Sequence, residues 1–379
     1  MYNADVGLTR WIVSRMRISA QLFTTVLVAW LLPACGSQAQ SPVQAPPPAL
    51  GSELFLVAEL SGEVVGFSES AGQLVSIPGS FITFPSILTG FAADPSGTMA
   101  VGFSGSPLLI ETLEGASIGA EGVLIQQTGT SMLRNAIDID VSQQGIIAIS
   151  TPPSGSVQFF NLQDGQFIAG ASVLVGLAPQ PIAFSPNGQF LYVGDNASGI
   201  ISVLSVASAS SVQLAGSAQM PFLAGERNPE LVRMRVNAAG NMIVTTTFDG
   251  RLYLASMNPA TGMISEAVEA HTAANANLES VVFDPTSTNV YAADLDNGGI
   301  YEFSLTGGSV QPLAGSPLAT APGIADMVSN SAGDRIYVAS RTAGIATYSR
   351  DLQSGALRAL GQSGINGALA FRIVRVPIH

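Results

Sequence analysis

A strand-and-turn pattern that recurs about every 47 residues constrains this chain of 379 residues more than any other feature. The clearest copy, residues 181–207, reads PIAFSPNGQFLYVGDNASGIISVLSVA, and two further clear copies cover residues 280–305 and 328–351. Weaker copies begin at Phe91, Ile137 and Met234. The first tight turns of the six copies are anchored at Gly97, Gly145, Gly188, Gly240, Ser287 and Gly333. A fixed period of this length indicates a solenoid, a propeller or an array.

Each copy consists of short apolar stretches separated by Gly, Asn, Asp and Pro, the residues typical of turns. Because the units contain strands and turns, the period predicts a β-propeller rather than helical repeats. Residues 53–77 supply the second to fourth strands of one more unit, and residues 368–378 supply its missing first strand. The sequence therefore predicts an all-β, seven-bladed propeller, with six or eight blades as alternatives. Pairing of the N- and C-terminal strands would close the ring and leave no long free edge.

The stretch FSPNGQFLYVGDNASGIISVLSV resembles the YVTN-type repeats of the lactonase-like propeller family, which includes the 6-phosphogluconolactonase-like enzymes. The resemblance covers nearly all of residues 51–379 and implies a propeller that can host hydrolysis of a sugar-acid lactone. Enzymes of the family typically place a histidine just before the Phe-Ser-Pro turn. The corresponding phrases here, which begin at Gln180, Glu279 and Ala325, contain none. The two histidines of the chain are His271, which we expect in a loop, and His379 at the terminus.

The first 34 residues read as an export signal that precedes the fold. Arg15 and Arg17 stand before an apolar run, residues 18–34, that is interrupted by polar residues and is short for a membrane-spanning helix. The run ends in Leu-Pro-Ala-Cys, which resembles the lipobox of bacterial lipoproteins, at the only cysteine of the chain, Cys35. We therefore predict a signal peptide in residues 1–34, with Met16 as an alternative start, and lipidation of Cys35.

A Pro- and Gln-rich tether in residues 35–50 would join the lipidated cysteine to the propeller in residues 51–379. By resemblance to lipoproteins, Gly36 after the cysteine implies the outer rather than the inner membrane. We accordingly expect an exported protein that is anchored to the membrane through Cys35, with its propeller in the periplasm or at the cell surface. The alternative for Cys35 is a buried or free thiol.

The amino-acid composition agrees with a β-propeller and argues against a nucleic-acid partner. Mean hydropathy is +0.39 and only 11% of residues are charged, which we attribute to the signal and to strands buried on both faces. The basic residues are 14 Arg with no Lys, against 26 acidic residues, and the formal net charge is −12. Since no basic stretch exists to neutralise phosphates, we expect no nucleic-acid partner.

Ligands of propellers usually bind in the central channel, where the first strands converge. Counting back from four of the turn anchors places charged residues on first strands, namely Asp138, Arg233, Glu279 and Asp326. Gly90 and Pro181 occupy the corresponding positions of two other copies, so the repeat itself does not require charge there. Acids grouped with an arginine can bind a cation, a sugar or a carboxylate. The alternative is a set of solvated charges paired with Arg233 and Arg134.

Two other sequence patterns are only weak indications of a calcium site and of a catalytic serine. Residues 294–299 resemble a calcium loop, but Gly298 and Leu305 stand where two of its ligands would be. Residues 115–119 match G-x-S-x-G, but the helix that a nucleophile elbow needs is not expected there. We therefore assign no catalytic residue and predict no metal and no cofactor.

The tether, the missing histidines and the lack of a strong nucleophile favour a function without catalysis. We expect a monomeric, lipid-anchored binding or interaction module of the cell envelope, with a protein or carbohydrate ligand. The alternative is a lactonase-like hydrolase that acts on a sugar-acid lactone in the central channel.

Overall fold

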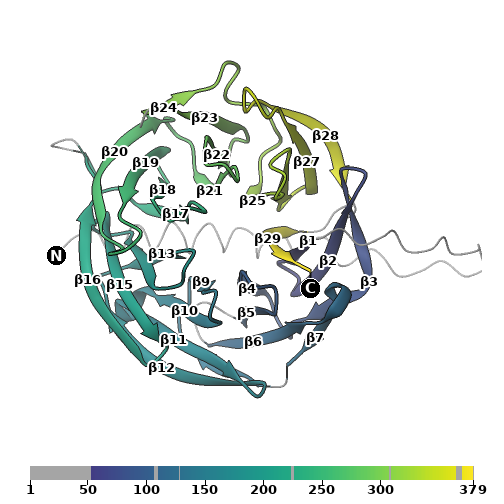
Figure 1. Ribbon diagram of the computed structural model, residues 1–379, viewed down its shortest axis with the longest axis vertical. Helices are drawn as coiled ribbons and strands as arrows, with labels where there is room; N and C mark the ends of the chain where they lie inside the picture. Colours follow the sequence, from purple (N-terminus) through teal and green to yellow (C-terminus); the bar gives the residue numbers. More distant parts are fainter. Residues whose placement is uncertain are drawn as a thin grey trace, which may run out of the picture. The chain divides into compact units, whose positions relative to one another are not determined.

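The computed structural model describes residues 53–105, 110–127, 129–222, 226–306, 309–363 and 369–378. These ranges form seven antiparallel sheets arranged as blades around a central axis (Figure 1). The all-β, seven-bladed propeller predicted from the repeat is therefore confirmed. The predicted signal in residues 1–34, Cys35 and the tether in residues 35–50 lie outside the described residues.

Each blade is a meander of four strands, from the innermost at the axis to the outermost at the rim. In the order of blades 1 to 7, the innermost strands are β29 (Ala370–Pro377), β4 (Leu88–Ala93), β9 (Asp138–Val141), β13 (Pro179–Phe184), β17 (Leu231–Val236), β21 (Leu278–Phe283) and β25 (Ile324–Ser329). The second strands are β1 (Glu53–Glu59), β5 (Met99–Gly105), β10 (Ile146–Thr151), β14 (Phe190–Asp195), β18 (Met242–Thr247), β22 (Asn289–Asp294) and β26 (Arg335–Ser340).

The outer half of each blade lies at the rim of the propeller. The third strands are β2 (Glu63–Ser70), β6 (Glu111–Ile118), β11 (Ser156–Gln163), β15 (Ile200–Ser208), β19 (Arg251–Met257), β23 (Ile300–Thr306) and β27 (Gly344–Arg350). The outermost strands are β3 (Gln73–Thr83), β7 (Leu124–Gln126), β12 (Gln166–Leu174), β16 (Ser211–Gln219), β20 (Ile264–Thr272), β24 (Ser309–Pro312) and β28 (Leu357–Ser363). In blade 2, a further short strand, β8 (Ser131–Leu133), also pairs with β6.

Blade 1 closes the ring with strands from both ends of the propeller. Its innermost strand, β29, is the last strand of the chain, whereas β1, β2 and β3 are the first three. β29 pairs antiparallel with β1 from Pro377 opposite Glu53 to Ala370 opposite Glu59. The predicted closure is thus confirmed, and the outermost strand β3 extends to Thr83 rather than ending at residue 77.

The turn that anchors each repeat has the same conformation in six blades. The anchor residues have φ between 58° and 74°, and each donates its amide to the carbonyl three residues earlier. That earlier residue is Asp, Ser or Asn, and its side chain accepts further amides; Asp94 Oδ1, for example, accepts those of Thr98 (2.9 Å) and Met99 (2.6 Å). Because glycine adopts positive φ readily, it recurs at this position in five of the six turns.

Hydrophobic cores lie between neighbouring blades, so a strand can be buried on both faces. β1 shows this at the closure: Leu54 and Leu56 pack in the core shared with blade 2, and Phe55 and Val57 in the core shared with blade 7. The Phe55 ring meets Tyr337 of β26 edge-on, with 4.7 Å between ring centroids. Such strands are continuously apolar rather than alternating, which accounts for the high hydropathy of the chain.

Helical structure is confined, among the described residues, to the short 3-10 turns η1 (Ala120–Gly122) and η2 (Pro152–Ser154). Within those residues no helix has the length and apolarity needed to span a membrane. The expectation that His271 lies in a loop is wrong, because its backbone pairs with Leu252 near the end of β20.

We predict that Phe55→Ala destabilises the propeller by about 3–5 kcal/mol, because it empties a fully buried position between the closing blade and blade 7. Phe81→Ala, which removes a ring that is 63% exposed on β3, serves as the matched control and should change stability by less than about 0.5 kcal/mol. Urea unfolding followed by far-UV circular dichroism measures both changes in the free energy of unfolding. Equal losses for the two variants would contradict the packing at the closure.

Candidate functional site

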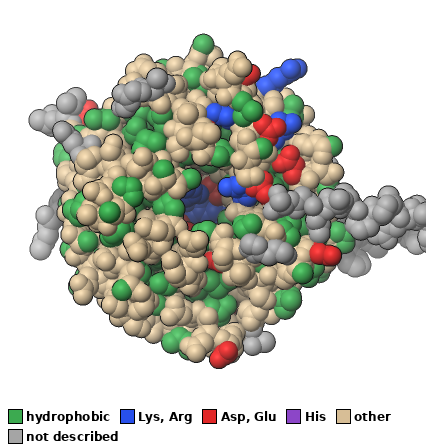
Figure 2. Space-filling model, in the orientation of Figure 1, with side chains coloured by type: hydrophobic (Ala, Val, Ile, Leu, Met, Phe, Trp, Pro, Cys, Tyr) green, Lys and Arg blue, Asp and Glu red, His purple; other side chains and the backbone are tan. Residues whose placement is uncertain are grey.

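The four charged residues predicted to share a site all lie on innermost strands. Asp138 is on β9, Arg233 on β17, Glu279 on β21 and Asp326 on β25. Each is at least nine-tenths buried. Figure 2 shows a hollow at the centre of the face, with basic side chains inside it and acidic ones beside them. The structure therefore brings the predicted side chains to the central channel.

Asp138 is shared by two guanidinium groups. Its Oδ1 lies 2.9 Å from Nη2 of Arg372, on the closing strand β29, and 3.8 Å from Nη1 of Arg233. Its Oδ2 accepts the amide of Ile182 at 3.1 Å. One carboxylate is thus shared by two arginines from different blades.

The other predicted acids have arginine partners of their own. Asp326 Oδ1 lies 3.3 Å from Nη2 of Arg235, and Glu279 Oε2 lies 3.1 Å from Nη2 of Arg341. Among the described residues no ion pair involves Arg134, the partner considered from the sequence, which is exposed. No group of three or more acidic, histidine or cysteine side chains within the described ranges could hold a metal ion.

Several of these charged groups also connect neighbouring innermost strands. The Asp138 carboxylate on β9 binds an amide of β13, and Asp326 Oδ2 on β25 accepts the amide of Ile373 on β29 at 3.3 Å. Arg233 Nε on β17 donates to the Glu279 carbonyl on β21 at 2.9 Å. The charges at the channel therefore contribute to blade-to-blade cohesion as well as to the electrostatics of the site.

Arg372 has hydrogen-bonding capacity that the protein does not use. Its Nη1 is buried and has no hydrogen-bond partner, although Nη2 of the same group binds Asp138. A buried guanidinium N–H without an acceptor costs free energy unless a ligand or water supplies one. This atom is the strongest indication that the channel accepts a negatively polarised group.

The neighbouring arginines affect the pKa of Arg233. Burial, together with the positive charges of Arg372 and Arg235, lowers the pKa of Arg233 to about 10, and the carboxylates of Asp326 and Asp138 oppose this shift. At neutral pH Arg233 is still charged. An anion in the channel would relieve this repulsion between guanidinium groups.

Sequence reasoning missed four charged residues of this group: Asp140, Arg235, Arg341 and Arg372. Asp140 and Arg235 stand two positions after Asp138 and Arg233, so the two-residue period of a strand would have found them. Arg372 was missed because β29 ends the chain and has no following turn from which to count back.

The weaker sequence patterns occupy the structural positions expected of turns and strands. Asp294 Oδ1 accepts the amides of Asn277, Asp296 and Asn297, so this carboxylate organises the hairpin between β22 and β23. Ser117 lies within β6 and has no elbow geometry. His379 lies outside the described residues.

Comparison with known proteins identifies the fold. No protein-family description matches the sequence, and no curated protein does. Similar solved structures include proposed 6-phosphogluconolactonases of Bacteroides uniformis (16% identity, 86% of this chain and 100% of that one, TM-score 0.73) and Bacteroides fragilis (18%, 87% and 100%, 0.69). The periplasmic gluconolactonase of Pseudomonas aeruginosa is also similar (14%, 86% and 99%, 0.68). At these identities the likeness establishes a shared seven-bladed, 6-phosphogluconolactonase-like propeller fold, as the repeats predicted.

We predict a pH dependence that originates at Asp140. Burial raises the pKa of this carboxyl to about 6, with the Phe184 amide and Arg235 opposing the shift. Because the folded state favours the neutral form of Asp140, ionisation of this carboxyl destabilises the folded protein as the pH rises from about 4 to about 6. The free energy of unfolding of the wild type should therefore fall, relative to Asp140→Asn, by about 1–3 kcal/mol over that interval. Urea unfolding of both proteins at pH 4 and pH 7 measures this, and a difference that stays constant or grows in the opposite direction would contradict it.

Proposed function

We propose that the propeller is a binding module for a small carboxylate-bearing ligand, such as a sugar acid, in its central channel. The observation that carries the proposal is the unpartnered Nη1 of Arg372, beside a second buried guanidinium, that of Arg233. Both arginines share one oxygen of Asp138, and Nη1 of Arg372 is left as a donor for an incoming anion.

The geometry suits a carboxylate with neutral polar substituents. Two guanidinium groups can hold the carboxylate by charge-assisted hydrogen bonds. The carboxylates of Asp138, Asp326 and Glu279 around them can accept hydrogen bonds from hydroxyl groups, but they repel further negative charge. A monoanionic polyol therefore fits this charge arrangement better than a polyanion does.

A second candidate function is hydrolysis of the lactone of such an acid. It is favoured by the fold shared with the Pseudomonas aeruginosa gluconolactonase and by carboxylates placed next to arginines. A carboxylate such as Glu279 could activate water, and Arg233 or Arg372 could stabilise the oxyanion that forms. The carboxylates of Asp138, Asp326 and Glu279 are already engaged with arginines, which is why binding is our first proposal.

We also propose that the protein is exported and anchored through a lipid on Cys35. The Leu-Pro-Ala-Cys sequence that ends an apolar run supports this proposal, as does the uncharged tether that follows. One structural relative is a periplasmic protein. The channel would then meet small solutes of the cell envelope.

We predict that the compact unit of residues 50–379 binds gluconate and that Arg372→Gln weakens this binding by about 10- to 100-fold, the effect of losing a charge-assisted hydrogen bond. Arg358→Gln, on the exposed side of β28, is the matched control and should bind as the wild type does. Isothermal titration calorimetry measures the affinities. In Arg372→Gln, Asp138 still has Arg233 as a partner, so we expect the variant to fold. Circular dichroism verifies this.

Three results would decide between the candidates. Gluconate binding that is lost in Arg372→Gln and kept in Arg358→Gln supports the binding module. Proton release from glucono-δ-lactone above the uncatalysed rate, abolished in Arg233→Ala, would replace it by the hydrolase. No response to either compound, or equal affinity in all variants, would overturn the channel as the ligand site.

We predict that the full chain incorporates a clickable palmitate analogue when it is expressed in a bacterium, and that Cys35→Ser abolishes the labelling. The thiol is the only one in the chain, so no other cysteine can substitute for it. Gel fluorescence after click coupling gives the readout. An unlabelled wild type, or equal labelling of Cys35→Ser, would contradict the anchor without affecting the proposal for the channel.

A further inference from the structure

Surface charge is distributed very unevenly around the ring. Residues 141–225, which run from the end of β9 to the loop after β16, contain only two charged residues, Asp164 and Asp195. The Asp195 carboxylate is buried and accepts the amides of Leu177 and Ala197. Figure 2 accordingly shows hydrophobic and uncharged side chains over the left of the face, where Figure 1 draws β15 and β16.

The outermost strands of blades 3 and 4 lack the features that protect the other rims. β12 and β16 are nine residues long and contain neither a charged residue nor a proline. Elsewhere the outermost strand carries Pro78 (β3), Glu269 (β20) or Arg358 (β28), or is as short as β7 and β24. Charges, prolines and short length are the usual devices that prevent association at strand edges. A β-bulge interrupts most of these strands, including β12 and β16, so it does not explain the difference.

Large apolar side chains project from this part of the rim. Ile168 and Leu174 of β12 are 50% and 76% exposed, and Leu214 of β16 is 58% exposed. β12 is joined to the neighbouring blade, since Ala171 donates its amide at 2.7 Å to the carbonyl of Ala209, in the turn between β15 and β16. We call the outer surface of β12, β16 and the turn between β15 and β16 the neutral face.

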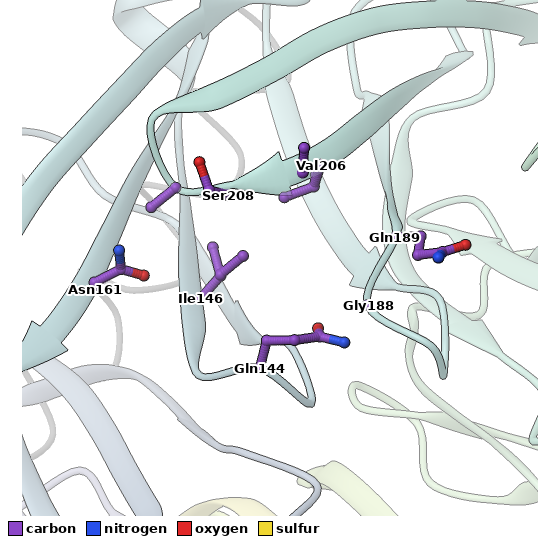
Figure 3. A pocket seen from close by; sticks show the side chains of 9 residues that line it. Gln144, Ile146, Asn161, Gly188, Gln189, Val206 and Ser208 are labelled. Atoms are coloured by element: carbon purple, nitrogen blue, oxygen red, sulfur yellow. The ribbon is translucent and has the colours of Figure 1, made fainter.

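A groove opens at the boundary of the same two blades (Figure 3). Its volume is about 440 Å³, and its lining is uncharged. The amides of Gln144, Asn161 and Gln189 surround a floor that includes Ile146 and Val206. Ala209, which accepts the β12 amide, also lines the groove, so the groove is continuous with the neutral face.

The charge distribution favours one occupant for this surface. Two copies of a chain with net charge −12 repel each other wherever their charged surfaces meet. The neutral face is where two copies can approach without bringing like charges together, and its exposed Ile168 and Leu214 would then leave water. A basic partner would instead be attracted to the acidic remainder of the protein.

We propose that the neutral face docks a second copy of this chain in a symmetric dimer. A two-fold axis places the same patch on both subunits, so an uncharged patch is automatically complementary in charge. β16 lies at the centre of the contact, because no charge other than the buried Asp195 occurs between Asp164 and Glu226. The proposal departs from the monomer expected from the sequence and does not depend on the ligand of the channel.

The test is sedimentation velocity of the compact unit, residues 50–379, at concentrations from 1 to about 200 µM. We expect a monomer–dimer equilibrium whose dissociation constant falls when salt is added, because salt screens the repulsion between acidic subunits. Leu214→Lys should raise the dissociation constant at least 10-fold, since it introduces charge at the centre of the contact. Phe81→Lys on β3 of blade 1, where the native side chain is 63% exposed, is the matched control and should leave the equilibrium unchanged.

A purely monomeric wild type at the highest concentration would overturn the proposal. So would a dimer that Leu214→Lys and Phe81→Lys weaken equally, because the contact would then not be centred on β16. Flotation of a monomeric wild type with phosphatidylcholine vesicles, lost in Leu214→Lys, would assign the face to a lipid surface instead. Both variants retain buried cores, and circular dichroism melting verifies that they are folded.

Discussion

Pairing of β29 with β1 is the interaction on which the rest of the molecule depends. It joins strands separated by more than 300 residues and turns seven similar meanders into a closed ring. Without it, two blades would expose apolar faces, because β1 contributes to the cores on both of its sides. The same pairing places Arg372 at the channel, so closure of the fold and completion of the candidate site are one event.

The channel combines cohesion with a potential for binding. The carboxylates of Asp138 and Asp326 hold neighbouring strands through main-chain amides, which fixes the arginines around them. Some polar atoms of the channel therefore hold the blades together, whereas Nη1 of Arg372 has no hydrogen-bond partner in the protein. A closed ring that holds an unsatisfied donor at its centre is preorganised for a ligand, because little reorganisation is needed on binding.

Much of the fold could be predicted because each blade repeats the same local chemistry. The turn of each repeat needs a residue with positive φ, so glycine recurs in the sequence at Gly97 and its counterparts. The spacing of these glycines predicts the blades. Asp138, Arg233, Glu279 and Asp326 could be placed at the channel from their distance to those turns. Arg372 could not, since β29 has no turn after it. The pairing of Asp138 with Arg372 arises only when residues from opposite ends of the propeller sequence are brought together.

A crystal structure of residues 50–379 soaked in gluconate tests the central claim most directly, namely that ring closure assembles an anion site in the channel. We predict density for the carboxylate within hydrogen-bonding distance of Nη1 of Arg372, with the ion pair between Arg372 and Asp138 retained. An empty channel, with gluconate absent or bound elsewhere on the ring, would contradict the account.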